Sequence, residues 1–464
     1  MDLRTLPDGL NAEERCNERR ARTEAETGTG LSLLKTDADR IGQADEKNCE
    51  QMIGSVPLPV GIAGPLSVTF SSGEKADIVL PLATTEAALV ASVNRGCKVL
   101  STIGGVSIQS VYHGISRSIV LKPKNGKTRS YTNLRRRLSA EDPPKADEGG
   151  HSHRDLLTTV GKPTSSLKEA IELLKKDWKI IGEATSSHLK ILHYDIDEAE
   201  GYVFLTIFCD TSEAMGMNMT TIAAQAIGDW LAKEFGVELI TIAGNVDSDK
   251  KPSKRTHDHG RGFEVTASAS VPSSVISEVL KTTPEALLAV ADAKLRVGSA
   301  LAGAIGRNLH AANIVAALYL ATGQDAAHVV EGSLADTEVE PLWNSPPPPS
   351  PPSAGEEGLS VSLPPPGEGS GMGEKTLQGI TIQTRLPALL VGVRGGGTAL
   401  PAQSQCLNLL LGKNQATSYK LQATSRLAES IGAAVLAGEL SLLAAQATQT
   451  LASAHRKLAR DSKQ

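Results

Sequence analysis

Aromatic side chains are scarce in this chain of 464 residues, since five Phe, six Tyr and three Trp make up only 3% of it. The core must therefore be filled by Ala, Leu, Val and Ile, and the 43 glycines allow close approach of helices and backbone. Such a composition favours sites lined by charge and main chain over recognition by aromatic stacking. At roughly 150 residues per domain, the length predicts two or three domains.

Paired cysteines, a dominant charge sign and a signal segment are also missing. The five cysteines are scattered without a Cys-X-X-Cys pair, which predicts free thiols in a reducing compartment. Lys plus Arg number 47 against 52 Asp plus Glu, which excludes a protein that coats nucleic acid. No run reaches the ~18 apolar residues of a membrane span, and the N-terminus lacks an apolar signal core. We therefore expect a cytoplasmic chain without a membrane span or a nucleic-acid partner.

Changes in composition divide the chain. Residues 1–47 are polar and predict one exposed helix over 11–27 followed by a linker. Residues 124–165 are charged and poor in apolar side chains, so they predict an insertion. Residues 344–375 hold nine of the 24 prolines, which predicts a disordered or polyproline insertion; a bland spacer is favoured over an SH3-type ligand.

The periodicity of the remaining segments indicates an α+β fold class. An amphipathic helix is predicted over 165–181, followed by a hairpin of 188–197 and 201–210 that turns at Glu200–Gly201. Segments rich in Ala predict further helices over 220–235, 273–282, 284–305, 311–322 and 417–459.

Four ionisable residues stand out, although each also fits an ordinary structural role. Glu86 precedes an apolar helical run, where it caps a helix or, if desolvated, donates a proton. Lys250 lies between aspartates in a polar loop, as in a surface ion pair. Asp325 follows a glycine and fits a helix N-cap, and His455 lies among basic residues near a helix end.

Metal and dinucleotide motifs are weak in this sequence. The pairs His151/His153 and His257/His259 lie in polar loops without a nearby Cys or carboxylate set, so no metal site is predicted. No Gly-X-Gly-X-X-Gly pattern follows a predicted strand, which disfavours a Rossmann site. The glycines of 212–219 and 392–398 allow backbone to approach a ligand, but each string alone is weak evidence.

Seven longer segments occur in one order at domain-scale spacing: NCEQMIGSVPLPVGIAGPL, LATTEAALVASVNRGCK, EAMGMNM, GNVDSDKKP, HAANIVAALYLATGQD, RGGGTALPAQ and AGELSL. Together they strongly resemble the catalytic portion of hydroxymethylglutaryl-coenzyme A (HMG-CoA) reductase in its eukaryotic-type, class I form. The resemblance covers roughly 48–120 and 175–460. That family reduces a thioester to an alcohol with two NADPH, and it releases CoA and mevalonate for isoprenoid synthesis.

The resemblance implies a domain plan and an assembly. The large, helix-rich domain is expected to comprise 48–117 and 243–464, with a small ferredoxin-like, NADPH-binding α+β domain inserted over 118–242. The expected partners are HMG-CoA, NADPH and further copies of the chain, as a homodimer or homotetramer.

The resemblance also gives the four ionisable residues catalytic roles. Lys250 matches the lysine that stabilises negative charge on the thioester oxygen. Glu86 matches the acid that protonates the new alkoxide close to that lysine, and Asp325 matches the aspartate that couples to both. His455 matches the histidine that protonates the CoA thiolate.

Binding positions carry over residue by residue. Those matching contacts to the hydroxymethylglutaryl group, the lysine loop and CoA are Arg117, Lys294, Asn313, Asp249, Lys251, Glu50, Ser92, Asn94 and Arg95. Those matching contacts to NADPH are Ser186, Glu213, Met215, Gly216, Met217, Asn218 and Arg460.

Several positions depart from the family pattern. On the cofactor side Ser187, Ser212 and Glu213 depart, and we hypothesise weaker NADPH affinity or relaxed NADP/NAD discrimination. On the substrate side Ala243 removes one hydrogen bond and Gln51 replaces the usual Asn; Arg394 also departs. Asp461 replaces a regulatory serine.

A further departure, Gln446, puts an amide beside Leu442 and Ala445, where the family has a leucine in the groove for statin inhibitors. We hypothesise a statin-tolerant, fungal-type duplicate that confers self-resistance. The alternative hypothesis is a catalytically weak homologue that acts as a binding or regulatory subunit or as an inhibitor sink.

Overall fold

The computed structural model describes residues 1–124, 166–344, 376–412 and 423–449. The insertions predicted over 124–165 and 344–375 lie, apart from their first residues, outside the described residues. His455, Arg460 and Asp461 also lie outside them.

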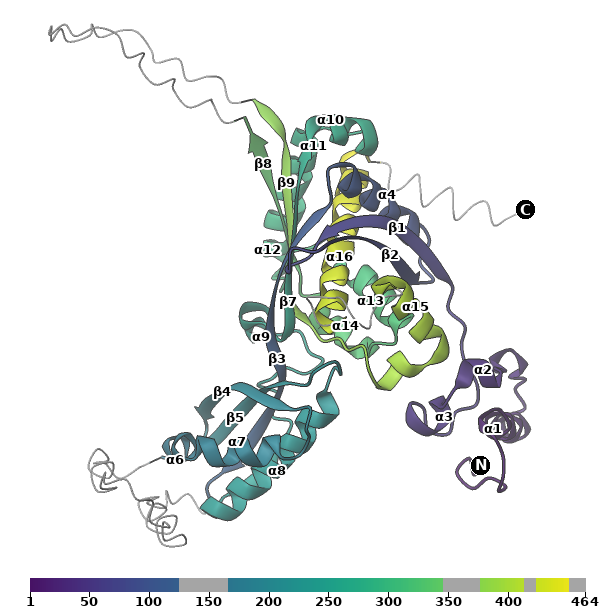
Figure 1. Ribbon diagram of the computed structural model, residues 1–464, viewed down its shortest axis with the longest axis vertical. Coiled ribbons are helices and arrows are strands. Elements are labelled where there is room, and N and C mark those ends of the chain that lie inside the picture. The colour runs from purple at the N-terminus through teal and green to yellow at the C-terminus, as the bar shows by residue number, and fades with distance from the viewer. Residues whose placement is uncertain (125–165, 345–375, 413–422, 450–464) are drawn as a thin grey trace, which may run out of the picture.

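One mixed sheet of nine strands runs through the described residues, and β3 joins its two parts (Figure 1). In the upper part of Figure 1 the strand order is β2-β1-β3-β7-β9-β8. The second half of β3 pairs with β5 and β6, and β5 pairs with β4, in what we call the lower lobe. The strands are β1 Val60–Thr69, β2 Lys75–Ala83, β3 Val106–Lys122, β4 Lys190–Ala199, β5 Tyr202–Asp210, β6 Glu238–Thr241, β7 Gly262–Pro272, β8 Asp336–Trp343 and β9 Leu377–Leu389.

The continuous strand β3 links the core of the upper part to that of the lower lobe. It pairs with β7 from Ser107 to Gly114 and with β5 from Ile115 to Leu121, antiparallel in both cases. The domain boundary predicted between 117 and 118 falls inside this strand. Residues on either side of that boundary are therefore held in one hydrogen-bonded ladder.

The helix α16 (Ala423–Ala447) forms the centre of the upper part, where it packs against α4 (Leu89–Thr102), α13 (Ala311–Thr322), β7 and β9. By length and composition it is the one helix among the described residues that could cross a membrane. However, 94% of its most apolar 18-residue segment is buried inside the protein. A mostly apolar helix that is buried on all sides is expected in the core of a large protein.

Glycine and alanine allow these helices to pack closely. A Cβ built on Gly96 of α4 would lie 1.9 Å from the carbonyl oxygen of Ala437 in α16. A Cβ on Gly432 would lie 2.5 Å from a methyl carbon of Val265 in β7. The expectation of a close-packed core with few aromatic residues is therefore confirmed.

The lower lobe has a core of its own. Trp178, Leu205 and Ile227 are fully buried there, between the sheet and the helices α7 (Lys175–Glu183) and α8 (Met217–Phe235). The predicted hairpin is confirmed, because β4 and β5 pair antiparallel and Glu200 and Gly201 turn with φ of 50° and 78°. The single helix predicted over 165–181 is wrong in detail, since it is divided at Leu174 into α6 (Leu167–Leu173) and α7.

The N-terminal segment folds against itself. The predicted helix is confirmed as α1 (Ala12–Thr27), which Asn11 and Glu14 close with a capping box. The expected linker instead contains η1 (Ser32–Leu34), α2 (Ala38–Ile41) and α3 (Ala44–Lys47). Cys16 is buried against these short helices, so α1 is not exposed on all sides.

The mixed α+β class is confirmed, and the helices predicted within 220–322 are present, two of them in pieces. The description of the upper part as helix-rich was incomplete, because it missed the six strands of the sheet there. It also missed α15. The other helical elements are α9 Lys254–His259, α10 Ser273–Val275, η4 Ile276–Leu280, α11 Pro284–Ala291, η5 Asp292–Gly298, α12 Ser299–Ala302, η6 Ala326–His328, α14 Val329–Gly332, η7 Gly396–Ala399 and α15 Pro401–Leu411.

Candidate active site

Lys250 and Asp325 form an ion pair between the loop that precedes α9 and the turn that follows α13. The ammonium Nζ lies 2.8 Å from the carboxylate Oδ2, and both side chains remain more than a third exposed. The other carboxylate oxygen, Oδ1, accepts the Ala327 N–H at 3.0 Å, so the N-cap interpretation of Asp325 is also confirmed. One carboxylate therefore fixes a turn and orients a cation.

The carboxylates beside Lys250 have opposite shifts in pKa. Burial raises the pKa of Asp247, and the nearby charges of Arg261 and Arg117 oppose that shift only in part. Burial acts in the same direction on Asp249, but Arg261, Arg117 and His328 together hold the pKa of Asp249 below its ordinary value. Arg117 Nη1 lies 3.0 Å from Asp249 Oδ2, so this predicted substrate residue belongs to the same charged cluster.

Three buried residues that sequence reasoning missed lie beneath the lysine loop. Arg261 is 1% exposed, and Glu331 and His328 are fully buried. Arg261 donates from Nη1 to Glu331 Oε1 at 2.9 Å and from Nη2 to Asp249 Oδ1 at 3.1 Å. The only signal in the sequence was a pair of ionisable residues three positions apart, His328 and Glu331, within an apolar stretch after Asp325.

Glu86 and Asn313 meet at the other end of α13. Asn313 Nδ2 donates to Glu86 Oε2, and Glu86 is exposed. The helix-cap interpretation of Glu86 is wrong, because α4 begins only at Leu89 and its N-cap residue makes no side-chain hydrogen bond. Since α13 has 12 residues, it separates its two ends by roughly 18 Å.

The expected close approach of Glu86 to Lys250 is therefore not found within one chain. Among the described residues, no hydrogen bond or ion pair joins Glu86 to Lys250 or to Asp325.

Two of the four residues predicted on the CoA side, Ser92 and Arg95, hold α4 against α16. Ser92 Oγ lies 3.1 Å from Ser441 Oγ, and Arg95 Nη2 donates to the Ser441 carbonyl at 2.5 Å. Asn94 Oδ1 accepts the Gly64 N–H at 3.0 Å. Glu50 is exposed and lies before the irregular segment 51–59 that leads into β1. Ser92 and Arg95 are thus positioned by the helix packing itself.

The two glycine-containing strings predicted separately come together at the start of α8. Glu213 pairs with Arg394, and its carbonyl accepts the Val393 N–H at 2.8 Å. Gly216 has φ of 87° and is the N-cap of α8. A Cβ on Gly392 would lie 2.3 Å from the Met215 nitrogen, so only glycine permits this approach. Two departures from the family pattern, at 213 and 394, are therefore one ion pair.

The remaining candidates lie apart from these clusters or make structural contacts. Lys251 Nζ donates to the Asp249 carbonyl at 2.9 Å, whereas Lys294 lies half-buried on η5. Ser186 Oγ contacts Met219 Sδ at 3.5 Å beside the first turn of α8. Met217 is buried, with its Sδ 3.4 Å from Arg261 Nη2, whereas Asn218 is exposed. The predicted inhibitor-groove residues Leu442, Ala445 and Gln446 lie in the last turns of α16.

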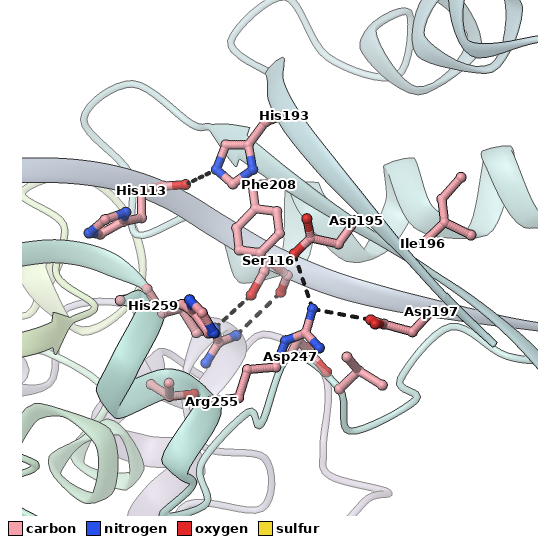
Figure 2. A pocket seen from close by; sticks show the side chains of 14 residues that line it. His113, Ser116, His193, Asp195, Ile196, Asp197, Phe208, Asp247, Arg255 and His259 are labelled. Carbon is pink, nitrogen blue, oxygen red and sulfur yellow. Dashed lines mark hydrogen bonds and ion pairs between the residues drawn. The ribbon is translucent and has the colours of Figure 1, made fainter. Parts of the chain in front are cut away.

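A cavity of about 500 Å³ lies between the β4–β5 hairpin and α9 (Figure 2). Arg255 contacts Asp195 and Asp197 there, each at 3.1 Å. Asp247 and Arg261 also line this cavity, so it adjoins the buried residues beneath the lysine loop, Arg261, Glu331 and His328. Neither Glu86 nor the ion pair of the lysine loop lines it, so it is not where the described catalytic candidates meet.

A metal ion fits poorly among the buried residues beneath the lysine loop. Asp249, His328 and Glu331 have ligand atoms within 4.8 Å of one another. However, the guanidinium of Arg261 already donates to both carboxylates from between them. A divalent cation would have to displace a fixed positive charge, so the prediction of no metal site stands as a prediction.

Comparison with solved structures identifies the class of fold. An HMG-CoA reductase of Streptococcus pneumoniae superposes with a TM-score of 0.56 at 16% identity, covering 93% of this chain and 96% of that chain. A class II reductase from the same organism, bound to NADPH in open conformations, gives 0.54 at 18% identity with the same coverage. At these identities the likeness shows that the chain shares the α+β reductase fold.

Sequence comparison identifies the family. The family model for hydroxymethylglutaryl-coenzyme A reductase matches residues 15–142 and 157–460. The reductase of Haloferax volcanii is 35% identical over 99% of this chain and 96% of its own length. That of Methanothermobacter thermautotrophicus is 34% identical over 95% and 92%. The chain belongs to the HMG-CoA reductase family, as the seven segments predicted.

Proposed function

We propose that this chain reduces HMG-CoA to mevalonate and CoA with two molecules of NADPH, for isoprenoid synthesis. The ion pair of Lys250 with Asp325 carries the proposal, because it presents a fixed, half-exposed cation on a loop surrounded by oriented carboxylates. Thioester reduction places negative charge on a carbonyl oxygen, and a positioned cation is the group that stabilises such a charge.

The chain's own residues divide the remaining work. NADPH, when bound, supplies the hydride. Lys250 would stabilise the oxygen that becomes negative, and Asp325 keeps its ammonium group oriented. Glu86, held by Asn313, would supply the proton for the alkoxide, and His455 would protonate the departing CoA sulfur.

The start of α8 fits the cofactor. Its first turn follows Gly216, and the free N–H groups of a helix start attract phosphate. The close approach of Gly392 to Met215 brings two main-chain segments together beside this helix start. We infer that 118–242 is the ferredoxin-like cofactor domain, which is supported by the separate core of the lower lobe. The proposed contacts are Ser186, Glu213, Met215, Gly216, Met217, Asn218 and Arg460.

A homodimer or homotetramer would complete the site. The two candidate pairs lie at opposite ends of α13 in one subunit, which leaves each pair without the other's chemistry. Val56, Leu58, Val60 and Ile62 are 73%, 40%, 50% and 51% exposed, so an apolar strip leads into and along β1. Such a strip is typical of an interface between subunits.

Statin tolerance is a second, narrower proposal. Gln446 lies half-buried one residue after the buried Ala445, where an amide disfavours a bulky apolar inhibitor. The inhibition constant for a statin should be higher for the wild type than for Gln446→Leu. Equal constants for the two proteins would refute a role for this residue.

The competing function is a catalytically weak homologue that binds ligands without turnover. Ala243 and Ser187 still favour it, but Glu213 and Arg394 count as one compensated change rather than two losses. Stoichiometry separates the two functions. The purified chain should oxidise two NADPH for each HMG-CoA consumed, and binding of HMG-CoA without oxidation would favour the weak homologue.

A further inference from the structure

The loop that carries Lys250 has an unusual main chain. Asn245, Ser248 and Lys250 have φ of 61°, 53° and 58°, and none of them is glycine. Residues in this left-handed region persist only where their surroundings over-determine the conformation. Something other than local preference must therefore hold the loop.

The carboxylate of Glu331 contacts this main chain directly. Its Oε1 accepts the N–H of Lys250 at 2.5 Å, and it also accepts Arg261 Nη1 at 2.9 Å. His328 Nδ1 lies 3.3 Å from the same oxygen. A buried carboxylate bonded to a main-chain N–H and a guanidinium makes charge-assisted hydrogen bonds, which are shorter and stronger than neutral ones.

The same cluster extends to both sides of Lys250 in the sequence and in space. Arg261 joins Glu331 to Asp249, the residue before Lys250. His328 Nε2 lies 3.7 Å from Asp325 Oδ2, the atom that contacts Lys250 Nζ. The main chain of the lysine and the acceptor of its ammonium group are therefore built on one buried framework.

We propose that Glu331 is a positioning residue for Lys250, acting through the Lys250 main chain and through Arg261 on Asp249. It fixes the left-handed conformation at 250, so that the ammonium group meets Asp325 before the substrate binds. This inference rests on the proposed function for its kinetic consequences, but its effect on the loop can be measured without turnover.

Two substitutions separate the charge of Glu331 from its reach. Glu331→Gln keeps the shape but removes the charge that pairs with Arg261. Glu331→Asp keeps the charge but withdraws it by one methylene from the Lys250 N–H. Either should lower kcat about tenfold, or ~1.4 kcal/mol, the scale of one charge-assisted hydrogen bond. The KM for HMG-CoA should change less than about threefold, because substrate contacts remain.

The readout independent of activity is hydrogen exchange of the peptide that spans 245–251. Its exchange should accelerate about tenfold in both Glu331 variants, since the Lys250 N–H loses the charge of its acceptor in Glu331→Gln and the close approach of its acceptor in Glu331→Asp. Glu429→Gln is the matched control. Glu429 lies on α16, is equally buried and accepts the Ser71 N–H at 2.9 Å and Ser110 Oγ at 2.6 Å, so its partners are in the β1–β2 turn and in β3 rather than in the lysine loop.

The outcomes distinguish failure of the positioning role of Glu331 from failure of the proposed reductase function. Glu429→Gln should lower the melting temperature without changing kcat or exchange in 245–251. If the Glu331 variants behave as Glu429→Gln does, the positioning role is overturned. An inactive wild type would overturn the proposed function, while unchanged exchange in 245–251 would overturn the positioning role alone. If Glu331→Gln does not fold, Arg261→Lys supplies the same readouts, and wild-type exchange in that variant would refute the inference.

Discussion

Replacing Gly96 with Ala tests the helix packing on which the proposed CoA contacts depend. In an ordinary helix interior this change stabilises by ~1 kcal/mol. Here the new Cβ would lie 1.9 Å from the carbonyl oxygen and 2.5 Å from the carbonyl carbon of Ala437, so backbone rather than a flexible side chain must move. Overpacking of this kind typically costs 1–3 kcal/mol, about enough to outweigh the gain in propensity. We expect Gly96→Ala to lower the free energy of unfolding measured in urea.

The same substitution should affect function in a defined way. Ser92 and Arg95 lie on α4 beside Gly96 and contact Ser441, so pushing α4 from α16 displaces both. The KM for HMG-CoA should therefore rise several-fold, with a smaller change in kcat. Gly182→Ala in α7 is the control, because its Cβ would meet methyl ends of Ile227 and Ile191, at 2.7 and 3.0 Å, that can turn aside. A Gly96→Ala protein as stable as the wild type would refute the argument.

Two further predictions concern charge. Glu213→Asp and Arg394→Val should each weaken NADPH binding, measured by calorimetry, and the double variant should lose less affinity than the product of the two single losses. Because the two side chains are 32% and 79% exposed, the coupling free energy should be only ~0.2–1 kcal/mol. Strictly additive losses of binding free energy would show that the two changes are independent. Burial acts to raise the pKa of Asp325. Hydrogen bonds from Lys250 and the Ala327 N–H, together with the charge of His328, outweigh burial and hold this pKa below its ordinary value. Because the unfolded carboxyl, with a pKa of ~3.9, binds protons first, the stability contributed by Asp325 is present above that pKa and is lost as pH falls through the folded pKa. Melting temperatures between pH 3 and 7 should fall less steeply on the acid side for Asp325→Asn, and parallel curves would contradict the pairing.

The sequence predicted elements well where the periodicity was local. The capped helix over 11–27 and the hairpin around Glu200 are set by neighbouring residues, and both are present. The strand β1 was missed because Gly61, Gly64 and Pro65 interrupt its alternation, and its pairing with β2 and β3 makes it a strand. Long-range pairing overrides such local signals.

The candidate site was predicted only in part for a similar reason. Lys250, Asp325 and Asp249 were found through the resemblance, and the structure brings them together. Arg261, Glu331 and His328 were not found, because their role depends on burial and on distant contacts, such as those of Glu331 with Lys250, 81 positions away, and of Arg261 with Ser116, 145 positions away. The link between Glu213 and Arg394, 181 positions apart, was equally invisible in sequence.

The central claim is that Lys250 makes this chain an NADPH-dependent reductase, and Lys250→Ala tests it most directly. Loss of one preorganised group that stabilises a developing oxyanion costs ~10²–10³ in kcat. We predict at least that loss of NADPH oxidation with HMG-CoA, with the wild-type melting temperature nearly retained because the lysine side chain is 42% exposed. A Lys250→Ala protein that oxidises NADPH at the wild-type rate would contradict the account.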